Sequence, residues 1–372
     1  MQPIIATGRK LLDQMEWIMT DKKPDLQGPV CPLPQKHTSR IVLGHGSGGK
    51  MMADLIKDVF YPRLENDPLL AGNDAGVIEL TNGLNLAVST DAHVVSPLFF
   101  PGGDIGRLAI CGTVNDVSMV GAIPLYLTAS FILEEGLEME TLKKVVDSMS
   151  EAAIEAGIDI ISGDTKVVAH GEADGMYIST TGVGLLDPRI NIGGENAKPG
   201  DNVIISGTIG DHGIAVLEAR GELGFQTQLK SDVAPLNHLI EEMIAASPGI
   251  HVLRDPTRGG VASALNEISK QSGVGIILNE DSLPVKPEVT GACEMLGFDP
   301  LYIANEGKLL ALVSPEETDK VLSAMHKSQY GQEAVVIGRV ESKPVGRLLL
   351  ETTLGSTRII DVLAGELLPR IC

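Results

Sequence analysis

The chain has few aromatic residues and few cysteines for its length. Phe, Trp and Tyr make up 3% of its 372 residues, so the core must be built from Val, Ile, Leu, Ala and Met. The cysteines are far apart and form no CxxC pair, which argues against a zinc site or a disulfide framework. They are Cys31, Cys111, Cys293 and Cys372. We therefore expect reduced thiols and a cytoplasmic protein, with Cys111 and Cys293 in the core.

Positive charge and long apolar runs are also scarce. Lys and Arg total 29 against 49 Asp and Glu, which gives a formal net charge of −20. Such a charge repels polyphosphate backbones at long range, so we expect no nucleic-acid partner. No segment approaches the ~20 apolar residues that a membrane span needs. The N-terminal stretch also lacks the compact apolar region and cleavage site of a signal peptide.

Short runs of Val, Ile and Leu, separated by Gly-rich turns, are what the chain has in quantity. From Arg40 onward these runs alternate with helical patterns, beginning with the strand-like 40–43, which indicates an α/β or α+β layer fold. The periodicity lapses at 187–201, a stretch of Gly, Pro, Asn and Asp that marks a domain boundary. The predicted parts are an extension at 1–38, a first domain at 39–188, a second domain at 189–350 and a mobile tail at 351–372.

A Gly-rich loop, "GHGSGGKM", occupies Gly44 to Met51 and has the spacing G-x-x-x-x-G-K. Backbone N–H groups of such a loop can wrap phosphate oxygens at a helix N-terminus. Its last position is Met51, however, and a thioether cannot give Mg²⁺ the hydroxyl ligand that Ser or Thr supplies. The loop is either a phosphate site whose metal is held elsewhere or a flexible turn, and His45 is either a phosphate contact or an ordinary loop histidine.

Aspartates at the ends of apolar runs are the candidates for holding that metal. Each of them could also be solvated surface in so acidic a chain. A cluster of carboxylates without a compensating basic stretch would repel itself unless a divalent cation lay among them. The candidates are Asp74, Asp91, Asp116, Asp164 and Asp255.

Two ionisable residues interrupt apolar surroundings. Lys166 is followed directly by two valines, and Glu306 lies between two strand-like runs. Buried ionisable groups are costly unless paired, and such costs are often tolerated where a proton must be transferred. The alternative for each is an ion pair or a turn residue.

The chain ends on "LLPRIC", which places a thiol on the last residue, Cys372. A chain terminus is a mobile tether, so it can carry a group between sites. A prenylation signal would place the cysteine four residues from the end, which this chain does not do.

Several of these motifs together resemble the HypE family of hydrogenase-maturation carbamoyl dehydratases. This family belongs to the superfamily of aminoimidazole ribonucleotide synthetase and selenophosphate synthetase. The resemblance runs from about Arg40 to Cys372, and the first 38 residues have no counterpart in it. The matching motifs are "HGSGGK", "STDAHVVSPLFFPGGDIGRLAICGTVNDVSMVGAIP", "GDTKVV", "RDPTRGG", "ANEGKLL" and "PRIC".

The resemblance implies a homodimer in which the sheets of two N-terminal domains pair into a barrel, with a C-terminal α/β domain packed beside each. It implies that Cys372 carries a carbamoyl group as a thiocarbamate, which ATP-dependent dehydration turns into a thiocyanate. The carbamoyltransferase HypF would be the donor, and the HypC–HypD iron scaffold the acceptor of cyanide for [NiFe] hydrogenase.

The resemblance also assigns residues. Lys166 and Glu306 would accept protons during dehydration. Mg²⁺ and phosphate would be bound by Asp74, Asp91, Asp116 and Asp255. ATP would be bound by His45, Gly46, Ser47, Gly48, Gly49, Lys50, Asn115, Asp164 and Thr165.

Two other functions compete with this one. A selenophosphate or purine-type synthetase would use a reactive cysteine near the Gly-rich loop or a free ribotide substrate, and this loop contains no cysteine. A binding module would use Cys372 only as an attachment handle.

Overall fold

The computed structural model describes residues 39–80, 83–224, 227–363, 365 and 371–372. The chain divides into two units, Met1–Arg40 and Ile41–Cys372, and every described helix and strand belongs to the second. The extension predicted at 1–38 lies outside the described residues. Within the described part of the chain, no helix is long and apolar enough to cross a membrane.

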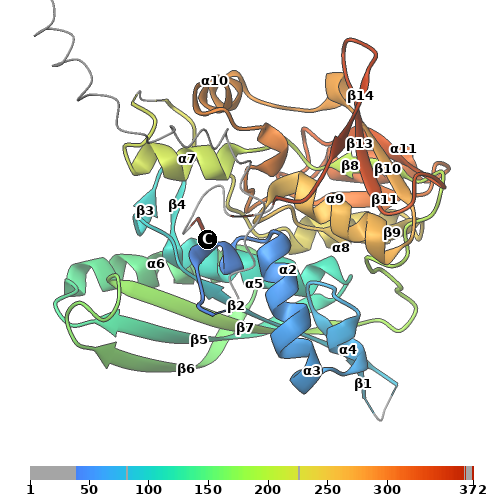
Figure 1. Cartoon of the computed structure of the whole chain (residues 1–372). Coiled ribbons are helices and arrows are strands. Elements are labelled where there is room, and N and C mark those ends of the chain that lie inside the picture. Colours follow the sequence, from blue (N-terminus) through green and yellow to red (C-terminus); the bar gives the residue numbers. More distant parts are fainter. Residues whose placement is uncertain (1–38, 81–82, 225–226, 364, 366–370) are drawn as a thin grey trace, which may run out of the picture. The chain divides into compact units, whose positions relative to one another are not determined.

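The N-terminal half of this unit is built on a five-stranded sheet (Figure 1). Its strands are β1 (Gly76–Glu79), β2 (Asn85–His93), β5 (Ile123–Glu134), β6 (Asp159–Val168) and β7 (Met176–Leu186). They lie in the order β1-β2-β7-β5-β6, antiparallel except for the parallel pair β5 and β6. Buried and less buried residues alternate along β7, as expected for a sheet with one covered face.

Two helices, α5 (Ile105–Met119) and α6 (Met139–Ala156), cover that face. The Asp104 carboxylate starts α5 by accepting hydrogen bonds from the N–H groups of Gly106 and Arg107, at 2.7 and 3.2 Å. Gly157, in the left-handed conformation with φ 71°, ends α6. Because α5 is buried on nearly all sides, it can contact both halves of this unit.

Shorter elements precede and follow β1 and β2. A series of short helical turns comes before β1 and includes no fully buried residue after Gly49. A small hairpin follows β2 and leads into α5. These elements are η1 (Leu43–Gly46), α2 (Lys50–Leu55), η2 (Ile56–Phe60), α3 (Tyr61–Leu64), α4 (Asp67–Leu70), β3 (Phe99–Phe100) and β4 (Gly103–Asp104).

The C-terminal half is built on a seven-stranded mixed sheet in the order β14-β13-β10-β12-β8-β11-β9. Its strands are β8 (Asn202–Ile205), β9 (Ile250–Arg254), β10 (Gly275–Asn279), β11 (Leu310–Val313), β12 (Val335–Glu341), β13 (Arg347–Glu351) and β14 (Thr357–Ile360). All four residues of β11 are buried, because helices cover both of its faces.

Those helices form separate layers. One cluster of buried side chains joins the sheet to α9 (Gly260–Gln271), and another joins it to α8 (Asn237–Ala246) and α11 (Thr318–Met325). The remaining helices, α7 (Asp211–Ala219) and α10 (Pro287–Leu296), share a smaller cluster with each other. Two short turns, η3 (Glu280–Ser282) and η4 (Pro300–Tyr302), complete the described elements.

Polar side chains of α5 tie the two halves together. The Asn115 amide donates a hydrogen bond to the carbonyl of Ala234 at 3.1 Å and accepts one from the N–H of Leu236 at 2.8 Å. The Arg107 guanidinium donates to the carbonyl of Val233 at 3.0 Å. Because both side chains hold the stretch 233–236, this stretch is fixed against the first sheet and its helices.

The two-domain layer fold indicated by the alternating pattern is confirmed, with two differences in detail. The strand-like run at 40–43 forms no strand: Ile41 is 73% exposed and Leu43 begins a 3-10 turn, because no neighbouring strand pairs with it. The stretch predicted as a tail, 351–372, contains β14, which pairs with β13 from Leu348↔Ile360 to Glu351↔Thr357. The second sheet therefore extends ten residues past the predicted domain end at 350, to Ile360.

Two glycines of β7 allow α5 to lie close to the sheet. A Cβ atom at Gly184 would lie 2.5 Å from the Cγ1 of Val117 and 2.8 Å from the carbonyl oxygen of Ile123. A Cβ atom at Gly182 would lie 2.8 Å from the Cγ2 of Thr113. The position of α5, and hence of everything that α5 holds, depends on the absence of side chains at these two points.

We predict that Gly184→Ala lowers the thermal unfolding midpoint, because the added methyl overpacks the core at a cost of about 1–3 kcal/mol. Gly291→Ala in α10 is the matched control, since no atom lies within 4 Å of its added Cβ. In a helix interior this control should be neutral or stabilising by about 0.5–1 kcal/mol. Equal midpoints for the two variants in differential scanning calorimetry would contradict the close contact between α5 and β7.

Candidate functional site

A cavity of about 290 Å³ lies where the two halves of the unit meet. Both halves contribute acidic and basic side chains to it, and the last residue of the chain enters it. Its wall is formed by Gly48, Met52, Asp74, Ser89, Thr90, Asp91, Gly112, Asp116, Arg254, Asp255, Thr257, Arg258, Ser263, Ala264, Glu267, Glu306 and Cys372. The four aspartates predicted to bind metal are all in this wall, although they are spread over some 180 residues of sequence.

Two arginines partly balance these carboxylates. Arg254 forms an ion pair with Asp74, with 3.0 Å between guanidinium nitrogen and carboxylate oxygen, and Arg258 lies 3.9 Å from Asp91. The Ser89 hydroxyl donates a hydrogen bond to Asp116 at 2.8 Å. Negative charge still exceeds positive charge in the wall, because Asp116, Asp255, Glu267 and Glu306 add to the two paired aspartates.

Burial and this excess of negative charge together shift the pKa values of the wall. Burial and the charges of Asp255, Asp91 and Asp74 raise the pKa of Asp116 well above its usual range. Burial and Asp74 raise the pKa of Asp255 to about 8, with Arg254 opposing them. Burial also acts to raise the pKa of Asp91, but His93 and Arg258 outweigh it and leave this pKa lowered. A cation in the cavity would relieve this repulsion.

The carboxylates fit a magnesium ion that is shared with phosphate. Within the described residues, no group of three or more His, Cys, Asp or Glu side chains is arranged to hold a metal ion alone. Mg²⁺ usually keeps several waters and takes only one or two protein carboxylates, with the other ligands coming from substrate phosphates. The cavity therefore suits a metal that arrives with a polyphosphate better than a preformed metal centre.

The Gly-rich loop lies directly against the cavity. Gly48, at φ 71°, lines it, and a Cβ atom there would lie 2.7 Å from the carbonyl oxygen of Arg258. Gly49 precedes α2, and the N–H of Lys50 donates to the carbonyl of Leu363 at 2.9 Å. The glycines are needed because the loop is packed between the "RDPTRGG" segment and the start of the tail.

The other loop residues are held within the loop. His45 Nδ1 accepts a hydrogen bond from the N–H of Val42 at 3.0 Å, and the Ser47 hydroxyl donates to the carbonyl of Gly44 at 2.9 Å. Gly46 has no atom within 4 Å of where a Cβ would lie. Of the six loop positions predicted to bind ATP, only Gly48 lines the cavity in this conformation.

The end of the chain is held in the cavity by both halves. The N–H of Val94, after β2, donates to a terminal oxygen of Cys372 at 3.0 Å. The Ile371 side chain is only 4% exposed and belongs to the core cluster of the first domain. Burial raises the pKa of the Cys372 thiol, which Arg258 opposes, so the unmodified thiol is protonated at neutral pH.

Glu306 lies beside this thiol and is 5% exposed. Its backbone N–H donates to Asp232 at 3.0 Å, and its Oε1 has no hydrogen-bond partner within the described part of the chain. Burial, Asp255 and Asp91 raise its pKa well above the usual range. A buried carboxyl of this kind, with a free oxygen next to a reactive group, is suited to proton transfer.

Four predicted site residues lie elsewhere. Lys166, Asp164 and Thr165 are on β6, an edge strand whose residues 159–167 are all exposed, and Lys166 pairs with Asp164 at 2.8 Å. They are not in the cavity wall of this chain. The amide of Asn115 is fully engaged by backbone groups of the second half, so its role in this structure is to hold the halves together.

Sequence reasoning missed Arg254 and Arg258. Both belong to the motif "RDPTRGG", in which only Asp255 was predicted to be a site residue. The excess of acidic candidates was the available signal, since a cluster of carboxylates calls for nearby cations.

Two family models match the chain. Residues 72–186 match the N-terminal domain of AIR synthase related protein, and residues 198–351 match its C-terminal domain. Together they span most of the described unit, and the gap between them covers the linker that joins the two sheets.

Relatives named carbamoyl dehydratase HypE are similar to this chain over nearly their whole length. Carbamoyl dehydratase HypE of Cupriavidus necator is 52% identical over 335 residues, which is 90% of this chain and 95% of the relative. The HypE of Escherichia coli is 47% identical over 338 residues, 90% of this chain and all of the relative.

Solved structures agree with these relatives. A HypE in complex with ATP has a TM-score of 0.75 at 46% identity, covering 90% of this chain and 100% of that one. The structure of a HypE–HypF complex gives a TM-score of 0.79 at 52% identity, covering 83% and 99%. With two matched domains and relatives about half identical over its length, the chain belongs to the AIR synthase related family and, within it, to the HypE carbamoyl dehydratases.

Proposed function

We propose that this chain dehydrates a carbamoyl group carried on Cys372, using ATP, and so supplies cyanide for the iron of [NiFe] hydrogenase. The observation that carries the proposal is the position of the Cys372 thiol. Although it belongs to the last residue, it lies in a cavity with four aspartates, two arginines and Glu306. The activity of the HypE relatives and the ATP held by a solved HypE support the same conclusion.

The reaction needs a better leaving group than oxide. The thiocarbamate Cys–S–C(=O)–NH₂ loses its oxygen only if that oxygen is first phosphorylated, which transfers the γ-phosphoryl group of ATP and releases ADP. Loss of two protons from nitrogen and departure of phosphate then leave Cys–S–C≡N. Positioning and charge neutralisation are the main contributions that a protein makes to such a phosphoryl transfer.

The residues of the cavity divide into two groups by chemistry. Asp91 and Asp116 line the same cavity as Gly48 of the Gly-rich loop, and they would hold Mg²⁺ together with the phosphates of ATP. Arg258 lies between this part and the thiol, since both Asp91 and Cys372 raise its pKa. Glu306, beside the thiol, would take the proton that leaves the amide nitrogen once the cation that accompanies ATP has lowered the pKa of its carboxyl.

A second copy of the chain would bring Lys166 to the site. The uncovered face and edge of the first sheet expose large apolar side chains, including Ile123 at 54%, Tyr126 at 45% and Ile161 at 61%. Such a surface is expected to be covered by a partner. Pairing of two such sheets into a barrel would cover it and would place Lys166, on the exposed strand β6, at the interface.

Other proteins would complete the cycle in the cytoplasm. The carbamoyl group would come from a carbamoyltransferase of the HypF type, because a relative has been solved in complex with HypF. The cyanide would pass to an iron scaffold of the HypC–HypD type. The tail must leave the cavity to meet both proteins.

We predict that Cys372→Ser binds ATP but gains no carbamoyl group. The hydroxyl is nearly isosteric with the thiol, so the fold and the cavity should be preserved, whereas it is a much poorer nucleophile at neutral pH. Intact-mass analysis after incubation with HypF, carbamoyl phosphate and ATP tests this. Carbamoylation of the serine variant at the wild-type extent would disprove the carrier role of Cys372.

We predict that Asp91→Asn and Asp116→Asn weaken Mg²⁺-dependent ATP binding by roughly tenfold or more, because each removes a hard anionic ligand. Carbamoyl loading should remain, since it takes place outside the cavity. Asp147→Asn on the exposed side of α6 is the control for charge alone. Calorimetric titration with ATP at a fixed Mg²⁺ concentration measures the affinity of each variant. Affinities equal to that of the control would exclude these two aspartates as ligands.

We predict that Glu306→Gln and Lys166→Ala each accumulate the carbamoylated protein, about 43 Da heavier than the free thiol, and form the species roughly 18 Da lighter on the order of 10²- to 10⁴-fold more slowly. If Lys166 acts across a dimer, mixing the two variants should restore activity. Mixed dimers would contain one complete site, formed by Glu306 and Cys372 of one copy and Lys166 of the other. Failure to complement, with dimers present, would place Lys166 outside the site.

A further inference from the structure

The end of the tail is bound by its backbone as well as by its thiol. The carbonyl oxygen of Ile371 lies 2.8 Å from Nε2 of His212, the second residue of α7. A terminal oxygen of Cys372 accepts from the N–H of Val94 on the other side. These contacts come from different halves of the chain, so together they fix both the position and the direction of the last two residues.

The protonation state of His212 follows from its partners. A carbonyl oxygen only accepts, so Nε2 must carry the hydrogen, and in a neutral ring Nδ1 is then an acceptor. The Ser231 hydroxyl lies 2.8 Å from Nδ1 and donates to it, while the N–H of Val233 donates to the Ser231 oxygen at 3.1 Å. The result is a chain of hydrogen bonds in one direction, from Val233 through Ser231 and His212 to Ile371.

The ring of His212 has no freedom to turn away from the tail. His212 is completely buried, and burial lowers the pKa of its imidazole, which keeps the ring neutral. Phe100 packs edge to face against the ring, with 5.4 Å between centroids and 89° between planes. When the tail leaves, Nε2–H loses its acceptor in a buried position, which is unfavourable and so favours return of the tail.

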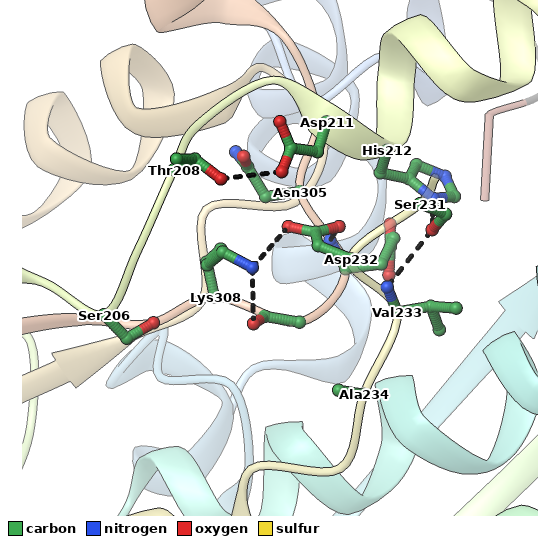
Figure 2. Close-up of polar contacts among 12 residues, drawn as sticks. Ser206, Thr208, Asp211, His212, Ser231, Asp232, Val233, Ala234, Asn305 and Lys308 are labelled. Atoms are coloured by element: carbon green, nitrogen blue, oxygen red, sulfur yellow. Dashed lines mark hydrogen bonds and ion pairs between the residues drawn. The ribbon is translucent and has the colours of Figure 1, made fainter. Parts of the chain in front are cut away.

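The residue after Ser231 holds Glu306. Asp232 accepts the backbone N–H of Glu306 at 3.0 Å and forms an ion pair with Lys308 at 3.4 Å. Figure 2 shows Ser231 beside His212 and, one residue on, Asp232 facing Lys308. The dipeptide 231–232 thus connects the tail with Glu306. Ser231 contacts His212, which binds the tail, and Asp232 binds the backbone of Glu306.

We propose that His212 is a positioning residue for the dehydration. Its Nε2–H binds the backbone carbonyl of residue 371, and the rigid dipeptide 231–232 sets the separation between the group on Cys372 and the carboxyl of Glu306. This inference rests on the proposed carrier role of Cys372. Loading by the donor takes place with the tail outside the cavity, so His212 should affect dehydration without affecting loading.

The test compares His212→Gln with His212→Asn. The Gln amide nitrogen can take the place of Nε2 and donate to Ile371, whereas the shorter Asn amide reaches only the position of Nδ1. Single-turnover formation of thiocyanate from purified carbamoylated protein should be about tenfold slower or more in His212→Asn, the effect of losing one buried hydrogen bond. In His212→Gln it should stay within about threefold of the wild type.

Two further measurements separate positioning from structure. Alkylation of Cys372 by iodoacetamide, followed on the C-terminal peptide, should be about tenfold faster in His212→Asn because the tail is released more often. Loading and ATP affinity should be unchanged in both variants. Ser231→Ala keeps the His212 ring but removes the hydroxyl that donates to Nδ1. In this variant thiocyanate formation should be about threefold slower and alkylation of Cys372 about threefold faster.

Three outcomes would overturn the proposal. The first is that His212→Asn forms thiocyanate and is alkylated at Cys372 at the wild-type rates. If this variant does not fold, the same result in Ser231→Ala counts instead. The second is equal loss in His212→Gln and His212→Asn, which would assign the effect to packing against Phe100. The third is loss of loading together with turnover. Failure of the wild-type protein itself to load or to form thiocyanate would instead refute the proposed function.

Discussion

The hydrogen-bonded anchoring of the chain terminus is the constraint on which the rest of this structure depends. A freely diffusing substrate can enter a closed pocket by itself. A substrate attached to the last residue can enter only together with the backbone that precedes it. The cavity that holds Cys372 is lined by residues from both halves of this unit. The halves must in turn be held at a fixed separation, which is the role of Asn115 and Arg107 on α5.

The electrostatics of the cavity follow from the same arrangement. The tail brings a thiol and a terminal carboxylate into a wall that already contains an excess of carboxylates. Arg258 is the group that faces both, since Cys372 and Asp91 are among the groups that raise its pKa. Without a second source of positive charge, Asp116 and Asp255 favour the protonated form. Binding of a cation with ATP would shift these groups toward the ionised form, so nucleotide and metal binding should reinforce each other.

The sequence was most informative where chemistry is carried by residue type and local pattern. Helix α6 follows from its apolar periodicity, and Asp74, Asp91, Asp116 and Asp255 do meet in one cavity. The sequence was least informative about the direction in which each side chain points. Nothing in "NDVSM" shows that Asn115 points to the second domain while Asp116 faces the cavity, because adjacent residues on a helix point about 100° apart and tertiary packing decides which side is which.

Lys166 shows a second kind of limit. Its motif predicts a role in chemistry, yet within one chain it lies on an exposed edge strand, paired with Asp164. A single sequence does not state whether a residue serves its own chain or a neighbouring copy, because symmetry is a property of the assembly. The exposed apolar face of the same sheet is the observation that supports the proposed pairing of two copies, and it becomes visible only once the strands are placed.

The segment "ANEGK" shows why function and packing cannot be separated at this site. The Asn305 amide accepts the N–H of Gly210 at 2.7 Å and donates to the carbonyl of Pro256 at 2.9 Å, which joins the start of α7 to the "RDPTRGG" segment. Gly307 lies so close to the backbone of Asp232 that no side chain fits. Glu306 is held between these two fixed points, so its carboxyl has little freedom to move. The proton transfer proposed for Glu306 requires a carboxyl that keeps its place while the substrate comes and goes, and its neighbours in sequence would provide that rigidity.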